Sequence, residues 1–493
     1  MPNVRRLEEA RSSGYTHFPV VLELFGDVYT PVGLYLKLRS SGKNSFLLES
    51  AEGGEKIGRY SFLGVDPFAT FMVSDEKTTL TENGIQRKID SHPIKALKEY
   101  FESFKVCPVD NLPRLAAGAV GFFGYDFVRY LENIPIVGSR NGLPEVFLNF
   151  YDTIVAVDNL KRRIDIVTLV PLAGNSSEQQ KKLDDKIAHI QKTAALLENG
   201  PLPKEAQKLP AGAPKFNITK DAFEKNVEHA RRYIVEGDVF QVVISQRAEF
   251  EYPGDPFLLY RGVRSQNPSP YMFYLEFSVE PEKRLAVIGS SPEMFVRKEG
   301  EIIEMRPIAG TRPRGATPDE DETLTRELLG DEKEKAEHVM LVDLGRNDIG
   351  RVAATGTVRV DNFMHVEKFS HVMHIVTDVS GKIDNGKDAV ETLAACFPAG
   401  TLSGAPKVRA MEIITELEKD ARQVYGGAVG YIDFNNNMDT CIAIRTFVVY
   451  GDKGYLQAGA GIVYDSDPER EYNETLNKMR ANLEALKIID RFQ

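Results

Sequence analysis

Residues 427–460 read GAVGYIDFNNNMDTCIAIRTFVVYGDKGYLQAGA, and this stretch says most about the fold. It holds three strand-like runs, Gly427–Phe434, Thr440–Tyr450 and Gly454–Ala460, which are joined by short turns. A helical segment is expected from about Asp467 onward. Antiparallel strands with short connections and flanking helices are typical of an α+β fold, so we do not expect a doubly wound sheet.

The rest of the chain continues this mixture of strands and helices. Residues 77–89 contain an Asn83-Gly84 turn signal, and the glycine-rich run at residues 116–125 is expected to be a buried strand. The run is not a phosphate loop, because it lacks the lysine and the hydroxyl residue that follow in a P-loop. Further strands are expected at residues 18–23, 46–49, 67–73, 153–158, 163–170, 239–250, 291–296 and 301–304, and helices at residues 176–199, 219–236, 319–347 and 408–417.

Residues 200–214 (GPLPKEAQKLPAGAP) carry four prolines and two glycines, a composition that is typical of an extended linker. The sequence therefore predicts an N-terminal regulatory or structural region over residues 1–199 and a catalytic domain over residues 215–493.

Composition excludes several classes of function. The formal net charge of −11 argues against a nucleic-acid or anionic-membrane partner, either of which favours a basic face. Cys107, Cys396 and Cys441 lie far apart and form no CxxC pair, so we expect reduced thiols. The N-terminal residues have no apolar signal core, and no apolar run approaches membrane-spanning length. We therefore expect a cytoplasmic protein.

Two expected helices each carry a pair of carboxylates with helical spacing. Glu334 and Glu337 are three residues apart, and so are Glu471 and Glu474, which follow a cap at Asp467. Such pairs are often only solvated helix faces. If they face a common cleft, however, hard oxygen ligands without cysteine or histidine suit Mg²⁺.

Four longer motifs carry a family resemblance: PIAGTR at residues 307–312, EKAEHVMLVDLGRND at 334–348, FPAGTLSGAPK at 397–407 and QAGAGIVYDSDPEREYNET at 457–475. They resemble motifs of the chorismate-utilising enzymes, and the chain as a whole is similar to anthranilate synthase component I, the large component. The resemblance implies large antiparallel β-sheets packed around a central cleft, with helices outside. It also implies Mg²⁺-dependent conversion of chorismate and ammonia into anthranilate and pyruvate, for tryptophan biosynthesis.

The resemblance also implies roles for individual residues. Glu337 and Glu474 match the magnesium ligands, and Glu334 is expected to be the general acid that protonates the departing ring hydroxyl. His374 and Thr401 match further catalytic positions, whereas His371 and His338 are expected to be structural. The residues expected to hold the substrate are Gly310, Thr311, Tyr425, Arg445, Gly459, Ala460 and Gly461.

Two positions discriminate between reactions within the family. Relatives that make aminodeoxychorismate usually carry a lysine nucleophile where this chain has Ala309, and alanine cannot provide one. Relatives that add water usually carry a lysine base where this chain has Gln241, and glutamine cannot deprotonate water. Both residues favour direct attack by ammonia. Aminodeoxychorismate synthase component I and a tryptophan-sensing protein on an inactive scaffold remain as alternatives.

The resemblance finally implies regulation and a partner. Residues 47–50 and 267–272 resemble the two halves of a tryptophan-inhibition site, with Ser50, Pro270, Tyr271 and Met272 as the expected contacts. No cysteine has the setting of a glutaminase nucleophile. We therefore expect a separate glutamine amidotransferase small subunit (component II) that supplies the ammonia, within a heterotetramer.

Overall fold

The structure is a computed structural model that describes residues 2–50, 58–135, 138, 141–203, 209–280, 283–369 and 372–489. The expected structural residue His371 and residues 204–208 of the expected linker lie outside this part of the chain.

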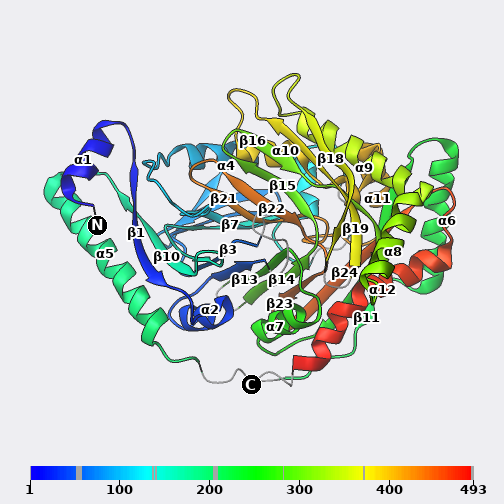
Figure 1. Cartoon of the computed structure of the whole chain (residues 1–493), viewed down its shortest axis with the longest axis horizontal. Helices are drawn as coiled ribbons and strands as arrows, with labels where there is room; N and C mark the ends of the chain where they lie inside the picture. Colours follow the sequence, from blue (N-terminus) through cyan, green and yellow to red (C-terminus); the bar gives the residue numbers. More distant parts are fainter. Residues whose placement is uncertain are drawn as a thin grey trace.

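Within the described residues the strands form two sheets of twelve, and the predicted α+β class is confirmed (Figure 1). Neighbouring strands pair antiparallel in both sheets. The first sheet, here sheet A, has the order β1 (His17–Phe25), β10 (Arg163–Pro171), β9 (Thr153–Asp158), β3 (Tyr60–Gly64), β2 (Ser45–Glu49), β13 (Tyr271–Glu280), β14 (Lys283–Ser291), β23 (Thr446–Tyr450), β24 (Lys453–Ile462), β12 (Gln241–Glu251) and β11 (Lys215–Phe216), with β20 (Gly404–Ala405) also on β12.

The second sheet, here sheet B, faces sheet A. Its order is β17 (Ile308–Pro313), β19 (Val372–Lys382), β16 (Ile302–Met305), β15 (Met294–Glu299), β22 (Met438–Ile442), β21 (Ala428–Asp433), β7 (Gly118–Phe123), β8 (Val146–Tyr151), β4 (Ala69–Ser74), β5 (Lys77–Glu82) and β6 (Ile85–Ile89), with β18 (Arg359–Lys368) also on β19.

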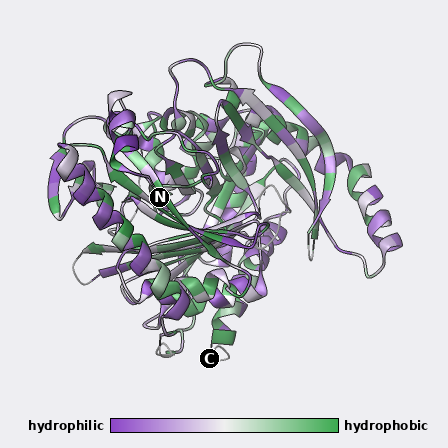
Figure 2. Cartoon of the chain, turned by 60° about the vertical axis from the view of Figure 1, so that its left-hand side comes forward, coloured by the Kyte–Doolittle hydropathy of each residue, from purple (hydrophilic) through white to green (hydrophobic). Residues whose placement is uncertain are grey.

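A core of apolar side chains joins the inner faces of the two sheets. Phe147 of β8 stacks on Phe277 of β13 with ring centroids 4.8 Å apart, and Phe62 of β3 meets Tyr431 of β21 edge to face. These contacts belong to one buried cluster to which both sheets contribute. The apolar alternation of the strands therefore buries one face of each sheet against the other, and Figure 2 shows the hydrophobic colour along these central strands.

Helices cover the outer faces of both sheets. Sheet A packs on α1 (Val4–Ser12), α2 (Pro31–Arg39), α5 (Ser176–Asn199), α7 (Pro256–Gln266) and α12 (Pro468–Ile488). Sheet B packs on α4 (Pro93–Glu102), α9 (Glu332–Gly350) and α10 (Ala389–Cys396). The helices α6 (Lys220–Glu236) and α11 (Lys407–Leu417) pack on β12 of sheet A, and α8 (Pro318–Gly330) lies over β17 and β19 of sheet B.

Most of the expected elements are present, but two long segments are divided. Residues 319–347 were expected as one helix, and they form α8 and α9 instead. The break lies at Asp331, whose side chain accepts hydrogen bonds from Lys333 N and Glu334 N and so begins the second helix. Residues 440–450 were expected as one strand, and they form β22 and β23 in different sheets.

Several connections of the chain lead from one sheet to the other, and two of these crossings lie next to each other. β14 of sheet A continues through Pro292 and Glu293 into β15 of sheet B, and β22 of sheet B continues through residues 443–445 into β23 of sheet A. Because β14 pairs with β23 and β15 pairs with β22, both crossings lie at the same edge of the inter-sheet core. Pro292, Glu293, Ile444 and Arg445 at these two crossings line one cavity.

The two predicted regions share both sheets. β2 from the N-terminal region pairs with β13, and β7 pairs with β21. The predicted division at residues 200–214 stays a prediction, but strands from both sides of it are needed to complete each sheet.

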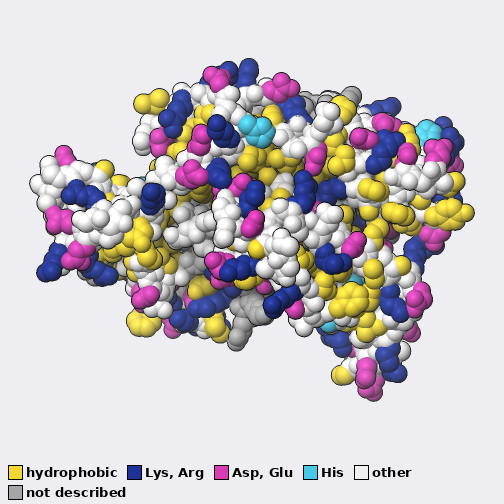
Figure 3. Space-filling view, turned by 90° about the horizontal axis from the view of Figure 1, so that it is seen from above, with side chains coloured by type: hydrophobic (Ala, Val, Ile, Leu, Met, Phe, Trp, Pro, Cys, Tyr) yellow, Lys and Arg dark blue, Asp and Glu magenta, His cyan; other side chains and the backbone are white. Residues whose placement is uncertain are grey.

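The surface carries charged side chains of both signs. On the face shown in Figure 3, Lys and Arg side chains are interspersed with Asp and Glu. None of the helices in the described ranges is long and apolar enough to cross a lipid bilayer.

Candidate active site

A large cavity lies where the chain crosses between the sheets, with a volume of about 1050 Å³. This is ample for a small-molecule substrate and its surrounding water. Residues from distant parts of the sequence meet in its wall, and the expected site residues among them are Gln241, Ala309, Gly310, Thr311, Glu334, Glu337, His374, Thr401, Tyr425, Arg445, Gly459, Gly461 and Glu474.

Ala460 is the expected substrate residue that does not line this cavity. Successive residues of a strand point to opposite faces, so Gly459 and Gly461 of β24 face the cavity while Ala460 lies fully buried among apolar residues behind it. Gly459 is required by its close neighbours, which include the Ile244 carbonyl oxygen at 2.8 Å, whereas a Cβ on Gly461 would displace only the end of the Gln241 side chain. A Cβ on Gly459 would lie 2.7 Å from the Tyr425 hydroxyl, and one on Gly461 would lie 2.3 Å from Nε2 of Gln241.

A β-bulge shapes the opposite wall. The pairing of β17 with β19 shifts register between Ala309 and Arg312, so Gly310 and Thr311 bulge out of the ladder. Gly310 has φ of 64°, and a Cβ there would lie 2.9 Å from Leu328 and 3.1 Å from a Glu334 oxygen. Only glycine takes this backbone conformation beside Glu334 without strain.

His374 of β19 is oriented by this bulge. Its Nδ1 lies 2.8 Å from the Gly310 carbonyl oxygen and 3.2 Å from Oγ1 of Thr311. A carbonyl only accepts, so Nδ1 carries the hydrogen and Nε2 keeps its lone pair. Burial, and to a lesser extent Arg445, lower the pKa of His374 below its usual value. The ring is therefore neutral near pH 7 and has a free basic nitrogen.

Four carboxylates from two helices line the cavity. Glu334 and Glu337 come from α9, and Glu471 and Glu474 from the first turns of α12. Burial raises the pKa values of Glu337 and Glu471, and repulsion by neighbouring carboxylates raises them further. One lysine, Lys478, pairs with Glu474 at 2.6 Å.

This donor set fits a divalent cation. Negative charge is crowded, the ligands are all oxygens, and Mg²⁺ needs only one or two carboxylates because it keeps waters and shares substrate oxygens. Within the described residues no three acidic, histidine or cysteine side chains lie close enough together to hold a metal ion, so water and substrate would have to complete the shell around one or two carboxylates.

Arg445 supplies a positive charge on the other side of the cavity. It lies at the crossing from β22 to β23 with φ of 51°, a conformation that costs energy for a residue with a side chain. Asn482 Nδ2 and Ser290 N donate to its carbonyl oxygen at 2.9 and 3.3 Å and hold this turn. Its guanidinium makes no ion pair with any described residue, so it is available to a carboxylate ligand.

Glu293 is a site residue that the sequence analysis missed. It lies at the other crossing, lines the same cavity, and is partly buried. Burial raises the pKa of its carboxyl to about 8, against opposing effects of Thr401 and Lys478. The sequence analysis placed Glu293 within one expected strand at residues 291–296, whereas β14 ends at Ser291 and β15 begins at Met294, so that Pro292 and Glu293 form the crossing.

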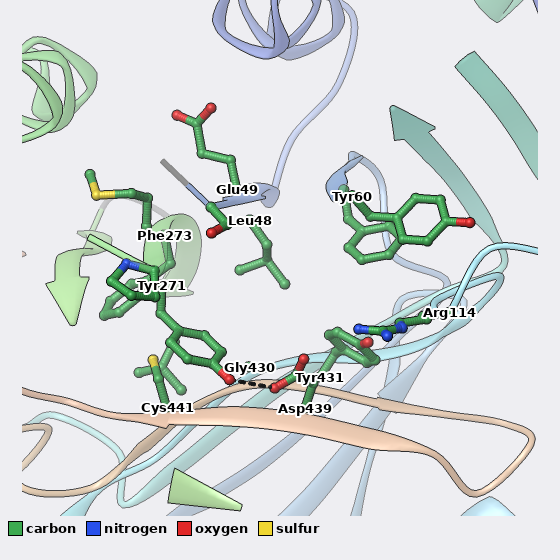
Figure 4. Close-up of a pocket in the computed structure, with 15 residues that line it drawn as sticks. Leu48, Glu49, Tyr60, Arg114, Tyr271, Phe273, Gly430, Tyr431, Asp439 and Cys441 are labelled. Atoms are coloured by element: carbon green, nitrogen blue, oxygen red, sulfur yellow. Dashed lines mark hydrogen bonds between the residues drawn. The ribbon is translucent and has the colours of Figure 1, made fainter. Parts of the chain in front are cut away.

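A second, smaller pocket contains the expected inhibitor residues (Figure 4). Its two halves are neighbouring strands, because Met272 and Phe273 of β13 pair with Glu49 and Leu48 of β2. Ser50, Pro270, Tyr271 and Met272 all line it, together with aromatic rings and Arg114.

Contacts at the edge of this pocket hold its shape. The Tyr271 hydroxyl donates to Asp439 of β22 at 3.1 Å, as the dashed line in Figure 4 shows. The Glu49 carboxylate points away from the pocket and pairs with Arg264 at 2.6 Å. An apolar, aromatic cavity with a few polar groups at its edge suits an aromatic amino acid.

Comparisons with known proteins agree with the fold and the site. The family of chorismate binding enzymes matches residues 43–484. Anthranilate synthase component 1 from Acetivibrio thermocellus is 49% identical over 483 residues and 96% of each chain. That from Aquifex aeolicus is 46% identical over 99% of this chain and 98% of its own.

Solved structures give the same result. Anthranilate synthase component I from Streptococcus pneumoniae superimposes with a TM-score of 0.75 at 36% identity, covering 93% of this chain and 99% of that one. The menaquinone-specific isochorismate synthase from Escherichia coli has a TM-score of 0.68 at 17% identity, and it shares the fold. The family resemblance and the fold expected from the sequence are confirmed.

Proposed function

Because the chain belongs to the family of chorismate binding enzymes, we propose that it converts chorismate and ammonia into anthranilate and pyruvate, as the large component of an anthranilate synthase. One observation carries the choice of reaction: Ala309 and Gln241 both line the main cavity, where a covalent amine or a water-activating base would otherwise stand. Neither side chain can act as nucleophile or base, whereas ammonia brings its own lone pair.

The substrate is a dianion, and the cavity offers two places for its carboxylates. Arg445 pairs with one carboxylate through its planar guanidinium, next to the Tyr425 hydroxyl. The other faces the carboxylates Glu337 and Glu474. When bound there, Mg²⁺ neutralises and orients that carboxylate.

The reaction needs an acid and a base at different atoms. Ammonia forms a bond to the ring carbon next to the carboxylate-bearing carbon, and the ring hydroxyl must leave with a proton. Glu334, which the sequence predicts to supply this proton, pairs with Arg312 at 3.3 Å. Glu293 with a pKa of about 8 holds a proton at neutral pH, and we assign it as the stronger candidate for the acid.

His374 is the base for the second stage. The aminated intermediate loses pyruvate and becomes aromatic, so a ring proton must be removed. The free Nε2 of a neutral imidazole, fixed by the Gly310 carbonyl, is suited to accept it.

Ammonia is supplied by a separate glutaminase subunit in this proposal. Burial raises the pKa values of Cys107, Cys396 and Cys441, which makes each thiol less nucleophilic. Since the thiols are unsuited to hydrolyse glutamine, the purified chain should make anthranilate with ammonium salt but not with glutamine. The heterotetramer and the cytoplasmic location stay predictions.

Tryptophan inhibits the enzyme by binding in the smaller pocket, which strands β2 and β13 line together with β21 and β22. Asp439 at the pocket lies on β22, the strand that continues into Arg445 in the main cavity. A ligand that changes the position of β22 therefore changes the position of a substrate-binding residue.

Anthranilate fluorescence tests the proposal. The chain contains no tryptophan, so product emission rises over a low background. Chorismate, ammonium salt and Mg²⁺ should give anthranilate, and added tryptophan should suppress it. A non-fluorescent aminated product would instead favour the aminodeoxychorismate reaction, and tryptophan binding without turnover would favour the sensor.

A further inference from the structure

A small side chamber adjoins the main cavity beneath α9. Its volume is about 30 Å³, which is enough for one or two water molecules. One face of α9 forms a wall of the chamber through Leu341, Gly345 and Asp348, which helical spacing places in line. Glu293 and Thr401 line the chamber and the main cavity alike. The chamber therefore lies directly behind two groups that face the reacting centre.

Asp348 brings a carboxylate oxygen without a hydrogen-bond partner among the described residues into this chamber. The residue is only 2% exposed, and its Oδ1 accepts a hydrogen bond from Nζ of Lys407 at 2.7 Å. Its Oδ2 is buried and has no hydrogen-bond partner among the residues that the structure describes. A buried carboxylate oxygen left unpaired is costly, and an internal water is the usual partner in a polar space of this size.

The Thr401 hydroxyl also lacks a hydrogen-bond partner of standard geometry among the described residues, and Thr401 lines the same chamber. Its Oγ1 is buried, although it lies close enough to the Glu293 carboxyl to lower the pKa of that group. A water in the chamber has two hydrogens to donate. It can satisfy Asp348 with one and the Thr401 hydroxyl with the other.

Lys407 connects the same aspartate to the Thr401 segment. Its Nζ also donates to the Cys396 carbonyl oxygen at 2.9 Å. Cys396 ends α10, Lys407 begins α11, and Thr401 lies between them. The Asp348–Lys407 pair therefore fastens both ends of this segment to α9, the helix that also carries Glu334 and Glu337.

We propose that the side chamber is a binding site for internal water, and that Asp348 acts through this water and Lys407 as a positioning residue for Thr401 and Glu293. The catalytic consequence rests on the proposed function, whereas the water site itself does not. No bond of the substrate is made or broken at Asp348; its effect is to fix the orientation of groups that contact the substrate.

Filling the chamber provides the first test. A Cβ at Gly345 meets Pro307 at 3.4 Å and Val379 at 3.9 Å, so Gly345→Ala places a methyl group in the chamber without a backbone clash. Gly350→Ala is the matched control, since it lies on the same helix and its Cβ meets nothing within 4 Å. We expect Gly345→Ala to displace the water in a high-resolution crystal structure and lower kcat about 10-fold, with KM for chorismate unchanged. Gly350→Ala should do neither.

Asp348→Asn provides the second test. The amide keeps an oxygen for Lys407 but presents a donor instead of an acceptor to the water. We expect kcat to fall roughly 10- to 100-fold with KM for chorismate nearly constant, because the segment is misplaced rather than the substrate released. A chamber without water in the wild-type crystal structure would overturn the site, and Gly345→Ala with wild-type kcat would overturn its role. If the wild type made no anthranilate, the proposed function would be wrong. The presence or absence of the water in the crystal structure would still test the proposed water site.

Discussion

Replacing Glu293 by glutamine keeps the size of the side chain and its capacity for hydrogen bonds but removes the acidic proton. If Glu293 protonates the departing hydroxyl, kcat should fall by about 10²- to 10⁴-fold, the usual contribution of a general acid. KM for chorismate should change little, because Arg445 and the metal-side carboxylates still hold the substrate. Glu334→Gln in the same assay separates the two candidate acids.

The raised pKa of Glu293 also predicts that Glu293→Gln, which lowers kcat, increases the stability of the folded protein at high pH. A carboxyl whose pKa rises from 4.5 to about 8 on folding destabilises the native state once the unfolded chain is ionised. Above pH 8 the cost is roughly 3 to 5 kcal/mol for this partly buried group. It is absent below pH 4 and grows between the two pKa values. Glu293→Gln should therefore be more stable than the wild type at pH 9 by an amount in this range, and nearly equal to it at pH 4.

The assay follows both quantities on the same samples. Anthranilate fluorescence gives kcat between pH 6 and 10, with total ammonium adjusted to keep free ammonia constant, and urea unfolding gives stability at each pH. Wild-type kcat should decrease above pH 8 as Glu293 loses its proton. A Glu293→Gln variant with more than half of wild-type kcat, or one less stable than the wild type at pH 9, would refute the reasoning.

Three further predictions concern the metal, the bulge and the inhibitor pocket. Glu337→Gln should abolish Mg²⁺-dependent anthranilate formation with an unchanged circular dichroism spectrum; full activity would rule out a ligand role. Gly310→Ala forces a Cβ to 2.9 Å from Leu328 and 3.1 Å from Glu334, so kcat should drop about 100-fold, and wild-type kcat would show that the bulge adapts. Ser50→Leu narrows the smaller pocket and should weaken tryptophan inhibition roughly 10-fold without changing kcat, as inhibition curves would reveal; unaltered inhibition would place the inhibitor elsewhere.

Local sequence signals located most of the elements, because the decisive groups lie next to each other in the chain. Thr219 caps α6 and Gly237 ends it with φ of 87°, both as expected. The glycine-rich apolar run at residues 116–125 correctly predicted the fully buried strand β7. The break of the expected long helix at Asp331 was missed, since helical periodicity continues on both sides and only the capping bonds distinguish the two helices.

The sequence by itself determined the family, the α+β class and most of the residues that line the cavity, because long motifs and strand periods are local properties of the chain. Only the tertiary structure decided what Glu293, Arg445 and Asp348 contact. Glu293 and Arg445 lie where two neighbouring strands pass from one sheet to the other. Burial between packed sheets raises the pKa of Glu293, and the approach of α9 to the Thr401 segment leaves an Asp348 oxygen without a partner in the part of the chain that the structure describes. Both effects depend on distances between residues far apart in sequence, and no local pattern encodes those distances.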